Sequence, residues 1–529
     1  MKTINIIYYI LLNLLIYQSA YSQYKEEWLL RNDLGGIDGA QMIIIDKTKS
    51  FYLIGNGGTE NYDMIILKYS VSRELQWMKK YNGPANENDL VNASVLDDLN
   101  NIYIVGSSTG NQSSDDFTVI KYNSNGDQLW IKRITSSGSH PDVAGDVILD
   151  SENNLYVTGI IYNDIGGSDC VTIKYDSSGN QIWENRYNRG VDRRNVGHEL
   201  IIDDSGNVYV TGQSGGDILT LKYNSTGLLE WSSIYDGPAN LDDIAGEILT
   251  DRNGNVYVAG SSIGEYYRDC ITIKYNSVGE KQWERRYNGS ANFIDGIESM
   301  NFDKNENIYV IGRSTETGQG YNITTIKYNS DGDQIWLSSY DNGPNDYAFS
   351  SFIDDSGSIF ISGQGDGNGT GFDMISLKLD SSGNQLWVQS YDYSGQYGDY
   401  GIYITSDQIG NIYVTGQSNR DFLTIKYSLL TGLNTTLSEI PTQYSLSQNY
   451  PNPFNPKTVI NYELRVTSDA KLKVFDVLGN EVAELVNEKQ NAGSYSVEFD
   501  GSGFASGIYF YSLLINGNII DTKRMILLK

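Results

Sequence analysis

The sequence IKYNSNGDQLW occupies Ile120–Trp130, and IKYNSDGDQIW repeats it at Ile326–Trp336. The lysine of this stretch recurs at intervals of 48 to 53 residues, at Lys68, Lys121, Lys174, Lys222, Lys274, Lys327, Lys378 and Lys426. A near-constant period in this range is typical of stacked supersecondary units. The repeat therefore decides the fold, and the chain must be analysed unit by unit.

Each unit is predicted to contain four short strands. In the fifth unit these are Ile244–Thr250, Val256–Gly260, Cys270–Tyr275 and Lys281–Tyr287, with Asx-x-x-Gly turns at 251–254 and 276–279. Glycine at the last position of such turns suits a left-handed backbone conformation. Four antiparallel strands repeated around a ring predict an all-β, eight-bladed β-propeller.

The tryptophan count predicts how the ring closes. Seven units carry a tryptophan on the fourth strand, whereas the last unit ends after Tyr427 without one. Trp28, ahead of the first unit, is the one remaining tryptophan. Since an open sheet edge favours aggregation, we expect residues 26–31 to supply the outer strand of the last blade.

Composition divides the chain into four segments. Residues 1–22 are predicted to be a secretory signal peptide, with Ala20-Tyr-Ser22 at the cleavage site, and no later segment is apolar enough to span a membrane. The propeller is placed at 23–428, a linker at 429–448 and a small β-sandwich at 449–529. The net charge of −28 lies almost wholly before the last domain, because residues 441–529 carry eight basic and nine acidic side chains. Such a surface repels nucleic acid.

Two parts of the chain resemble known families. The runs GN[IV]YVxG and TIKYNSxGxQxW resemble the bacterial SBBP β-propeller repeat, whose name implies seven blades where eight units stand here. The tail resembles the type A sorting domain of the type IX secretion system, through Asn449–Pro456, Val474–Gly479, Ala492–Gly493, Ser506–Phe510 and Lys523–Lys529. This resemblance implies a Bacteroidota-type bacterium, the type IX machinery as partner, and a location at the outer-membrane surface or outside the cell.

Features that recur in every unit are expected to be structural. The repeated lysine should pack between blades with its ammonium paired to a carboxylate. An aspartate opens the third strand of seven units, and we expect it to accept backbone N–H groups, with calcium binding as the alternative. Cys170 and Cys270 fill an apolar slot of the repeat, which predicts two free, buried thiols.

Features that break the period are better candidates for ligand binding. Arg189, Arg193, Arg194 and His198 are placed in the loop from the third blade to the fourth, and Tyr266, Tyr267 and Arg268 in a loop of the fifth. The alternative to ligand binding is that both are variable surface loops without a specific function. The loops Gly212–Asp217 and Gly416–Asp421 are shorter than their six equivalents. Because blades four and eight are opposite in the ring, these loops predict a groove for an extended, anionic ligand.

The function expected is that of an exported binding module for an extracellular glycan or protein. A polysaccharide hydrolase or lyase and a purely structural surface protein remain as alternatives. The chain has only two histidines, His140 and His198, and lacks nucleophile-elbow and zinc-protease motifs, so no catalytic residue is assigned. No cofactor is expected, calcium being left open.

Overall fold

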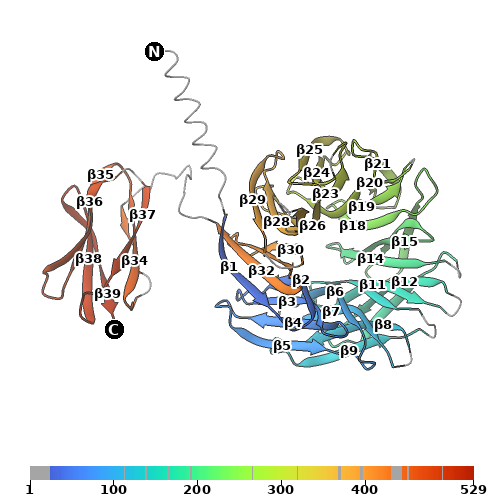
Figure 1. Cartoon of the computed structure of the whole chain (residues 1–529), viewed down its shortest axis with the longest axis horizontal. Coiled ribbons are helices and arrows are strands. Elements are labelled where there is room, and N and C mark those ends of the chain that lie inside the picture. The colour runs from blue at the N-terminus through green and yellow to red at the C-terminus, as the bar shows by residue number, and fades with distance from the viewer. Residues whose placement is uncertain are drawn as a thin grey trace, which may run out of the picture. The chain divides into compact units, whose positions relative to one another are not determined.

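The computed structural model describes residues 24–429 and 444–528, apart from 112, 137–139, 164–165, 191–192, 265, 319, 367–370, 394–396, 450–451 and 491–492. The expected signal peptide and most of the expected linker lie outside the described residues. The chain divides between Leu429 and Leu430 into two compact units (Figure 1). Within the described ranges, no helix has the length and apolar character needed to cross a membrane.

The first unit consists of eight four-stranded antiparallel sheets, which confirms the eight-bladed prediction. The first strands are β2 (Ile37–Ile45), β6 (Asp89–Leu96), β10 (Val143–Leu149), β14 (Asn195–Ile202), β18 (Ile244–Thr250), β22 (Gly296–Phe302), β26 (Asp346–Ile353) and β30 (Asp399–Ser406). The second strands are β3 (Phe51–Gly58), β7 (Ile102–Thr109), β11 (Leu155–Tyr162), β15 (Val208–Ser214), β19 (Val256–Ile263), β23 (Ile308–Thr315), β27 (Ile359–Asp366) and β31 (Ile412–Ser418).

The outer half of each blade contains two more strands. The third strands are β4 (Asp63–Tyr69), β8 (Asp115–Tyr122), β12 (Ser168–Tyr175), β16 (Asp217–Tyr223), β20 (Arg268–Tyr275), β24 (Tyr321–Tyr328), β28 (Phe372–Leu379) and β32 (Asp421–Leu429). The fourth strands are β5 (Leu75–Tyr81), β9 (Gln128–Ile134), β13 (Gln181–Tyr187), β17 (Leu229–Tyr235), β21 (Lys281–Tyr287), β25 (Gln334–Tyr340), β29 (Gln385–Tyr391) and, in blade 8, β1 (Tyr24–Asn32).

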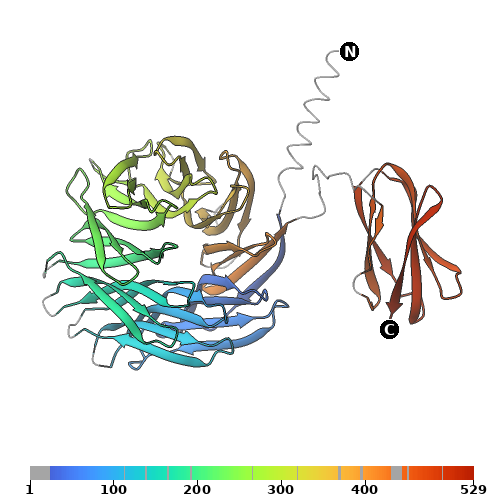
Figure 2. The same ribbon diagram turned by 180° about the vertical axis from the view of Figure 1, so that it is seen from behind.

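The N-terminal strand β1 closes the ring, as the tryptophan count predicts. It pairs with β32 from Tyr24 opposite Leu429 to Asn32 opposite Phe422. Figure 2 shows this strand, in blue, against the orange strands of the last blade. Trp28 lies opposite Lys426, the register that Trp130 has with Lys121 in blade 2. The edge of the last blade is therefore covered by a strand of the same kind as in every other blade.

The repeated lysine and tryptophan connect blades 1, 2, 4, 5 and 6 to the next blade through a turn carbonyl. In blade 2, Lys121 Nζ and Trp130 Nε1 donate to the carbonyl of Ser177, in a turn of blade 3, at 2.9 and 3.5 Å. Gly179 in that turn has φ +82°, and a Cβ there would lie 3.0 Å from the ring of Trp130. Lys121 also pairs with Asp97 at 3.5 Å. The predicted structural role of the lysine is thus confirmed.

Apolar packing between neighbouring blades forms the rest of the propeller core. One cluster joins Tyr103, Val105 and Phe117 of blade 2 to Leu155 and Val171 of blade 3. The two cysteines belong to such clusters, and both are free and buried, as predicted. Cysteine here acts as a small apolar side chain.

The role predicted for the third-strand aspartates was wrong. Six of the seven form side-chain ion pairs, such as that between Asp116 and Arg133 at 2.6 Å, and Asp373 accepts a hydrogen bond from Ser390. A second ring of buried residues binds the backbone instead: Asp142 accepts the N–H groups of Ser136 and Tyr162 at 2.6 and 2.7 Å. The connection between blades leaves these N–H groups without strand partners, so a carboxylate must satisfy them. The ring contains Asp38, Asp89, Asp142, Asn195, Asp243, Asp295, Asp346 and Asp399.

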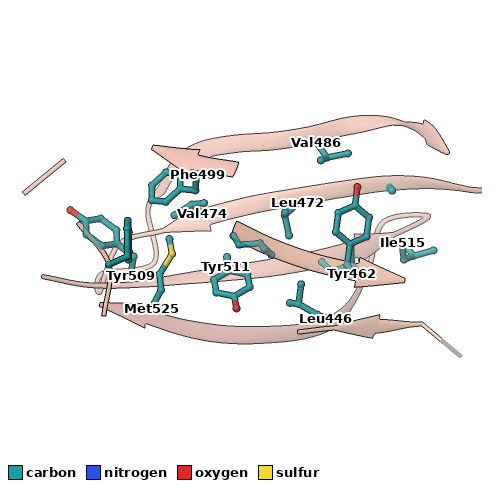
Figure 3. Close-up of a cluster of buried hydrophobic side chains, with 14 of the residues drawn as sticks. Leu446, Tyr462, Leu472, Val474, Val486, Phe499, Tyr509, Tyr511, Ile515 and Met525 are labelled. Atoms are coloured by element: carbon teal, nitrogen blue, oxygen red, sulfur yellow. The ribbon is translucent and has the colours of Figure 1, made fainter. Parts of the chain in front are cut away.

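The second unit is a small β-sandwich. One sheet contains β33 (Ser445–Leu446), β34 (Lys457–Leu464) and β37 (Gly493–Asp500). The other contains β36 (Glu481–Gln490), β35 (Ser468–Phe475), β38 (Gly507–Ile515) and β39 (Asn518–Leu527). Side chains from both sheets, including Leu472, Phe499 and Tyr511, fill a single core (Figure 3).

Candidate ligand-binding face

One face of the propeller, here called the upper face, carries the connections between blades and the loops between second and third strands. Backbone hydrogen bonds join these two kinds of segment. The N–H of Asp142 donates to the carbonyl of Asp115, and that of Asp295 to the carbonyl of Arg268, both at 2.8 Å. Bonds or a β-bridge of this kind anchor the start of the first strand of blades 1 to 7 to the third strand of the preceding blade. Side chains from neighbouring blades consequently meet on this face.

The predicted arginines lie between blades 3 and 4. Arg189 forms an ion pair with Asp217 at 2.7 Å. Arg193 and Arg194 are exposed, and the guanidinium of Arg193 lies over Gly215, where an added Cβ would be 2.6 Å from its Nη1. The backbone carbonyls of both residues accept hydrogen bonds from the ends of neighbouring strands. Arg189 is therefore part of the structure, while Arg193 and Arg194 offer their side chains to solvent.

His198 lies outside the loop that carries these arginines, which corrects the sequence assignment. It lies inside β14, not in the loop, because the strand begins at Asn195, which is anchored to Ser168. The His198 ring lines the central channel, and its Nδ1 is 3.1 Å from the carbonyl oxygen of Ala245. Burial lowers the pKa of His198.

The predicted tyrosines lie between blades 5 and 6, apart from the arginines. Tyr266 and Tyr267 are exposed, and the ring of Tyr267 contacts that of Phe293, with 4.6 Å between centroids. Arg268 is the first residue of β20, and its carbonyl anchors Asp295. The structure thus places the sequence-selected residues at two separate blade junctions.

A band of four aromatic rings crosses blades 6, 7 and 8 on the upper face. Tyr321, Tyr347, Phe372 and Tyr400 follow one another with centroid separations of 5.3, 6.0 and 6.4 Å. All four rings are partly exposed. The Arg313 guanidinium lies 5.7 and 5.5 Å from the centroids of the first two rings. We call these four residues the aromatic band.

The aromatic band breaks the repeat. Tyr347 and Tyr400 each follow the buried aspartate that opens a first strand. In the other six blades this position is occupied by Gly39, Leu90, Val143, Val196, Ile244 and Gly296. Alignment of the units at this slot would have identified the two tyrosines. Tyr321 and Phe372 come from third strands, and only the fold places them between the others.

The connections between second and third strands are shortest at blades 4 and 8, and we call these two places the low points of the upper face. Gly215–Gly216 joins β15 to β16 and Asn419–Arg420 joins β31 to β32, both as two-residue turns with positive φ. Such turns are the tightest hairpin connections. The Arg420 guanidinium lies 3.5 Å from the centroid of Tyr397 at the end of the aromatic band. Each low point therefore has arginine beside it.

The central channel has two different walls around a cavity of about 740 Å³. First strands of blades 3 to 6 contribute Asp146, His198, Glu199, Glu247 and Glu298. The other blades contribute mainly apolar or small side chains, including Met42, Phe349, Phe352, Ile402 and Tyr403. Acidic and apolar side chains thus face each other across the channel.

The carboxylates of the acidic wall bind backbone N–H groups of neighbouring blades, and burial raises their pKa values. Each first strand contains a β-bulge, and Asp146 and Glu199 accept N–H groups of the next blade, from Leu200 at 3.0 Å and Ile248 at 2.7 Å. Burial raises the pKa of Asp146 to about 6 and that of Glu247 to about 7. Burial and the neighbouring carboxylates also hold the pKa of Glu199 well above its usual range. These groups can carry protons near neutral pH.

One acidic group could be considered for a metal ion. Among the described residues, only Asp33, Asp38 and Asp421 bring three ligand oxygens within 4.8 Å of one another. Arg31 already binds Asp421 at 2.6 Å, and Asp38 accepts two backbone N–H groups. Calcium binding stays the alternative to the expectation that no cofactor is bound.

Solved structures resemble the propeller. Sqt1 from Chaetomium thermophilum is 11% identical, with 76% of this chain and 99% of that chain covered and a TM-score of 0.52. The WD40 domain of SCAP from fission yeast is 10% identical, with coverage of 77% and 98% and a TM-score of 0.41. The Sqt1 likeness supports the fold alone. No curated protein matches the chain.

Two family models match parts of the sequence. The secretion system C-terminal sorting domain matches residues 448–528, which lie within the second unit. The SBBP β-propeller repeat matches residues 230–267, from β17 to the end of the β19–β20 loop. A tail of this family directs export through type IX secretion to the cell surface or the extracellular space. The chain is therefore a type IX secretion cargo that joins a β-propeller, matched in part by the SBBP repeat, to a C-terminal sorting domain.

Proposed function

We propose that this exported propeller binds an extracellular glycan on its upper face, with the aromatic band as the contact surface. The observation that carries the proposal is the row of four adjacent rings. Two of them, Tyr347 and Tyr400, stand in a slot that holds glycine or an aliphatic residue in the other six blades. Tyrosine and phenylalanine present flat, rigid apolar faces at a low cost in conformational entropy. Such faces suit the C–H surfaces of sugar rings.

The low points at blades 4 and 8 favour an extended chain. A ligand lying from one to the other would cross the mouth of the channel between Arg193 and Arg194 on one side and Arg420 on the other. Guanidinium groups bind carboxylate and sulfate oxygens in pairs. The ligand proposed is therefore a glycan that carries acidic groups.

Binding of the purified chain to a panel of acidic and neutral polysaccharides tests this proposal. We expect Tyr347→Ala combined with Tyr400→Ala to weaken binding about tenfold or more, because central aromatic contacts dominate affinity. Tyr162→Ala is the matched control: Tyr162 stacks on His140, also on the upper face, but between blades 2 and 3. Equal affinity of the double variant and the wild type would refute the role of the band.

Two controls separate the parts of the proposal. Loss of binding in Arg193→Ala with Arg194→Ala but not in the aromatic variant would favour charge alone. A propeller that binds no glycan but retains a protein from the culture medium through the same tyrosines would favour a protein ligand, since Tyr and Arg also dominate protein interfaces.

A polysaccharide hydrolase or lyase is a second candidate, favoured by the acidic wall. A carboxyl group with a pKa near neutrality can act as a general acid or base, and Glu247 and Asp146 have such values. Polysaccharide cleavage that is lost in Glu247→Gln and retained in Tyr162→Ala would establish an enzyme. Binding without cleavage would support the binding module.

A further inference from the structure

Sixteen β-hairpins of the described structure share one tight turn, in which the carbonyl of the first residue accepts the N–H of the residue three positions later. Fifteen of them join the first to the second strand or the third to the fourth strand of a blade, and one, at Asp476, joins β35 to β36 in the sorting domain. In the blade-3 turn Asp176–Asn180, Asp176 Oδ1 also accepts the N–H groups of Ser178 and Asn180, at 2.9 and 2.8 Å. In the sorting-domain turn, Asp476 Oδ1 accepts those of Leu478 and Asn480, both at 2.9 Å.

The two turns match in conformation but not in the residues at their tips. Gly179 and Gly479 have φ values of +82° and +85°, and Asn180 and Asn480 each donate to their aspartate. The tip residues are Ser177 and Ser178 in the propeller but Val477 and Leu478 in the sorting domain. The sequence DSSGN thus forms the same turn as DVLGN, so the turn itself does not require apolar residues.

Two adjacent apolar side chains at a tip are unique to this turn among the sixteen. Val477 and Leu478 are 65% and 84% exposed, and no other large apolar residue among the described ones is as exposed as Leu478. The propeller tips carry at most one apolar residue each, at Val71, Leu99, Val278 and Ile409. Exposed apolar pairs favour contact with another surface.

We propose that Val477 and Leu478 dock into an apolar pocket of the type IX secretion machinery when it recognises the sorting domain. The domain has to be read by that machinery, and it is close to neutral, with eight basic and nine acidic side chains in residues 441–529. Apolar contacts are therefore better suited to its recognition than net charge. The Asp476 hydrogen bonds hold the tip rigid before contact, which lowers the entropy lost on docking.

The test replaces the tip with the sequence that the propeller uses. The full chain carrying Val477→Ser and Leu478→Ser is expressed in the native host, and the exported and periplasmic fractions are quantified. We expect export to fall about tenfold or more, with folded chain retained in the periplasm. Val278→Ser is the matched control, because Val278 is 65% exposed at the same kind of tip in the propeller. Export of that variant should equal the wild type.

Further measurements keep a folding defect apart from a docking defect. Thermal unfolding of the purified full chain should be the same for the double Ser variant and the wild type, since DSSGN forms the same turn. Val477→Ile with Leu478→Met should export normally. Normal export of the double Ser variant would overturn the proposal. A lower melting temperature would also overturn it, because the tip would then be packed within the chain and not against the machinery.

Discussion

The seam between blades and the upper face of the same propeller are governed by different constraints. At the seam, a lysine and a tryptophan donate to the same turn carbonyl of the next blade in blades 1, 2, 4, 5 and 6. On the upper face, one slot holds glycine, leucine, valine, isoleucine or tyrosine from blade to blade. A repeat protein must repeat what joins its units, but it can vary what the units present to solvent. Stability should therefore respond to changes at the seam, and ligand binding to changes on the face.

Removal of Tyr24–Asn32 should have the largest effect, because it opens the seam of the last blade. Trp28 and Tyr24 are buried, at 9% and 5% exposure, and the loss of two large aromatic side chains costs about 5 kcal/mol or more. We expect aggregation or a strongly lowered denaturation midpoint in urea. Unfolding of the truncated chain at the wild-type midpoint would refute closure by this strand.

A single methyl group at the seam should have the next largest effect. Gly179→Ala adds a Cβ 3.0 Å from Trp130, whereas Gly318→Ala, with the same φ of +82°, adds one with no atom within 4 Å. Both changes carry the cost of a left-handed backbone, about 1–2 kcal/mol. Gly179→Ala should cost roughly 1–3 kcal/mol more, from overpacking. Equal free energies of unfolding would mean that the tryptophan contact does not constrain the turn.

The acidic wall should make stability depend on pH. The raised pKa values of Asp146 and Glu247 mean that the folded state binds more protons than the unfolded state between pH 4 and 7. The free energy of unfolding should therefore fall as pH rises through this range, by about 2 kcal/mol for Asp146 alone. Melting temperatures from pH 5 to 8 measure this slope. Asp146→Asn with Glu247→Gln should flatten it, and an unchanged slope would assign it to other groups.

Changes confined to the upper face should have the smallest effect on stability. Arg193 and Arg194 are exposed, so replacing both by alanine should change the free energy of unfolding by less than about 0.5 kcal/mol. The same variant should weaken binding of an acidic glycan. A large loss of stability would show that these arginines belong to the seam after all.

The sequence predicts the repeated part of the molecule well. Blade number, closure at Trp28 and the buried state of Cys170 and Cys270 all follow from slots that recur with the period. The periodic pattern carries this information because each blade must fit the next. The short loops at blades 4 and 8 could be predicted in the same way, because the other six units show the usual length of this loop.

The candidate site is harder to predict, for two physical reasons. A β-bulge in each first strand shifts the alternation of side chains, so the sequence does not reveal that His198 and Glu199 line the channel. The aromatic band alternates between the third strand of one blade and the first strand of the next. Tyr321 and Tyr347 are 26 positions apart, and only the anchoring of neighbouring blades brings them together.

Closure by the N-terminal strand also means that the ring can close only after the last strand of the propeller has been synthesised. Arg31 and Asp421, which form an ion pair across the closing strands, are 390 positions apart. A truncated chain lacks β32, so β1 has no pairing partner and remains an exposed strand that favours aggregation. Contacts between such distant positions form late in folding. The sorting domain follows β32 in the chain. A chain that contains its sorting domain therefore also contains every strand needed to close the ring.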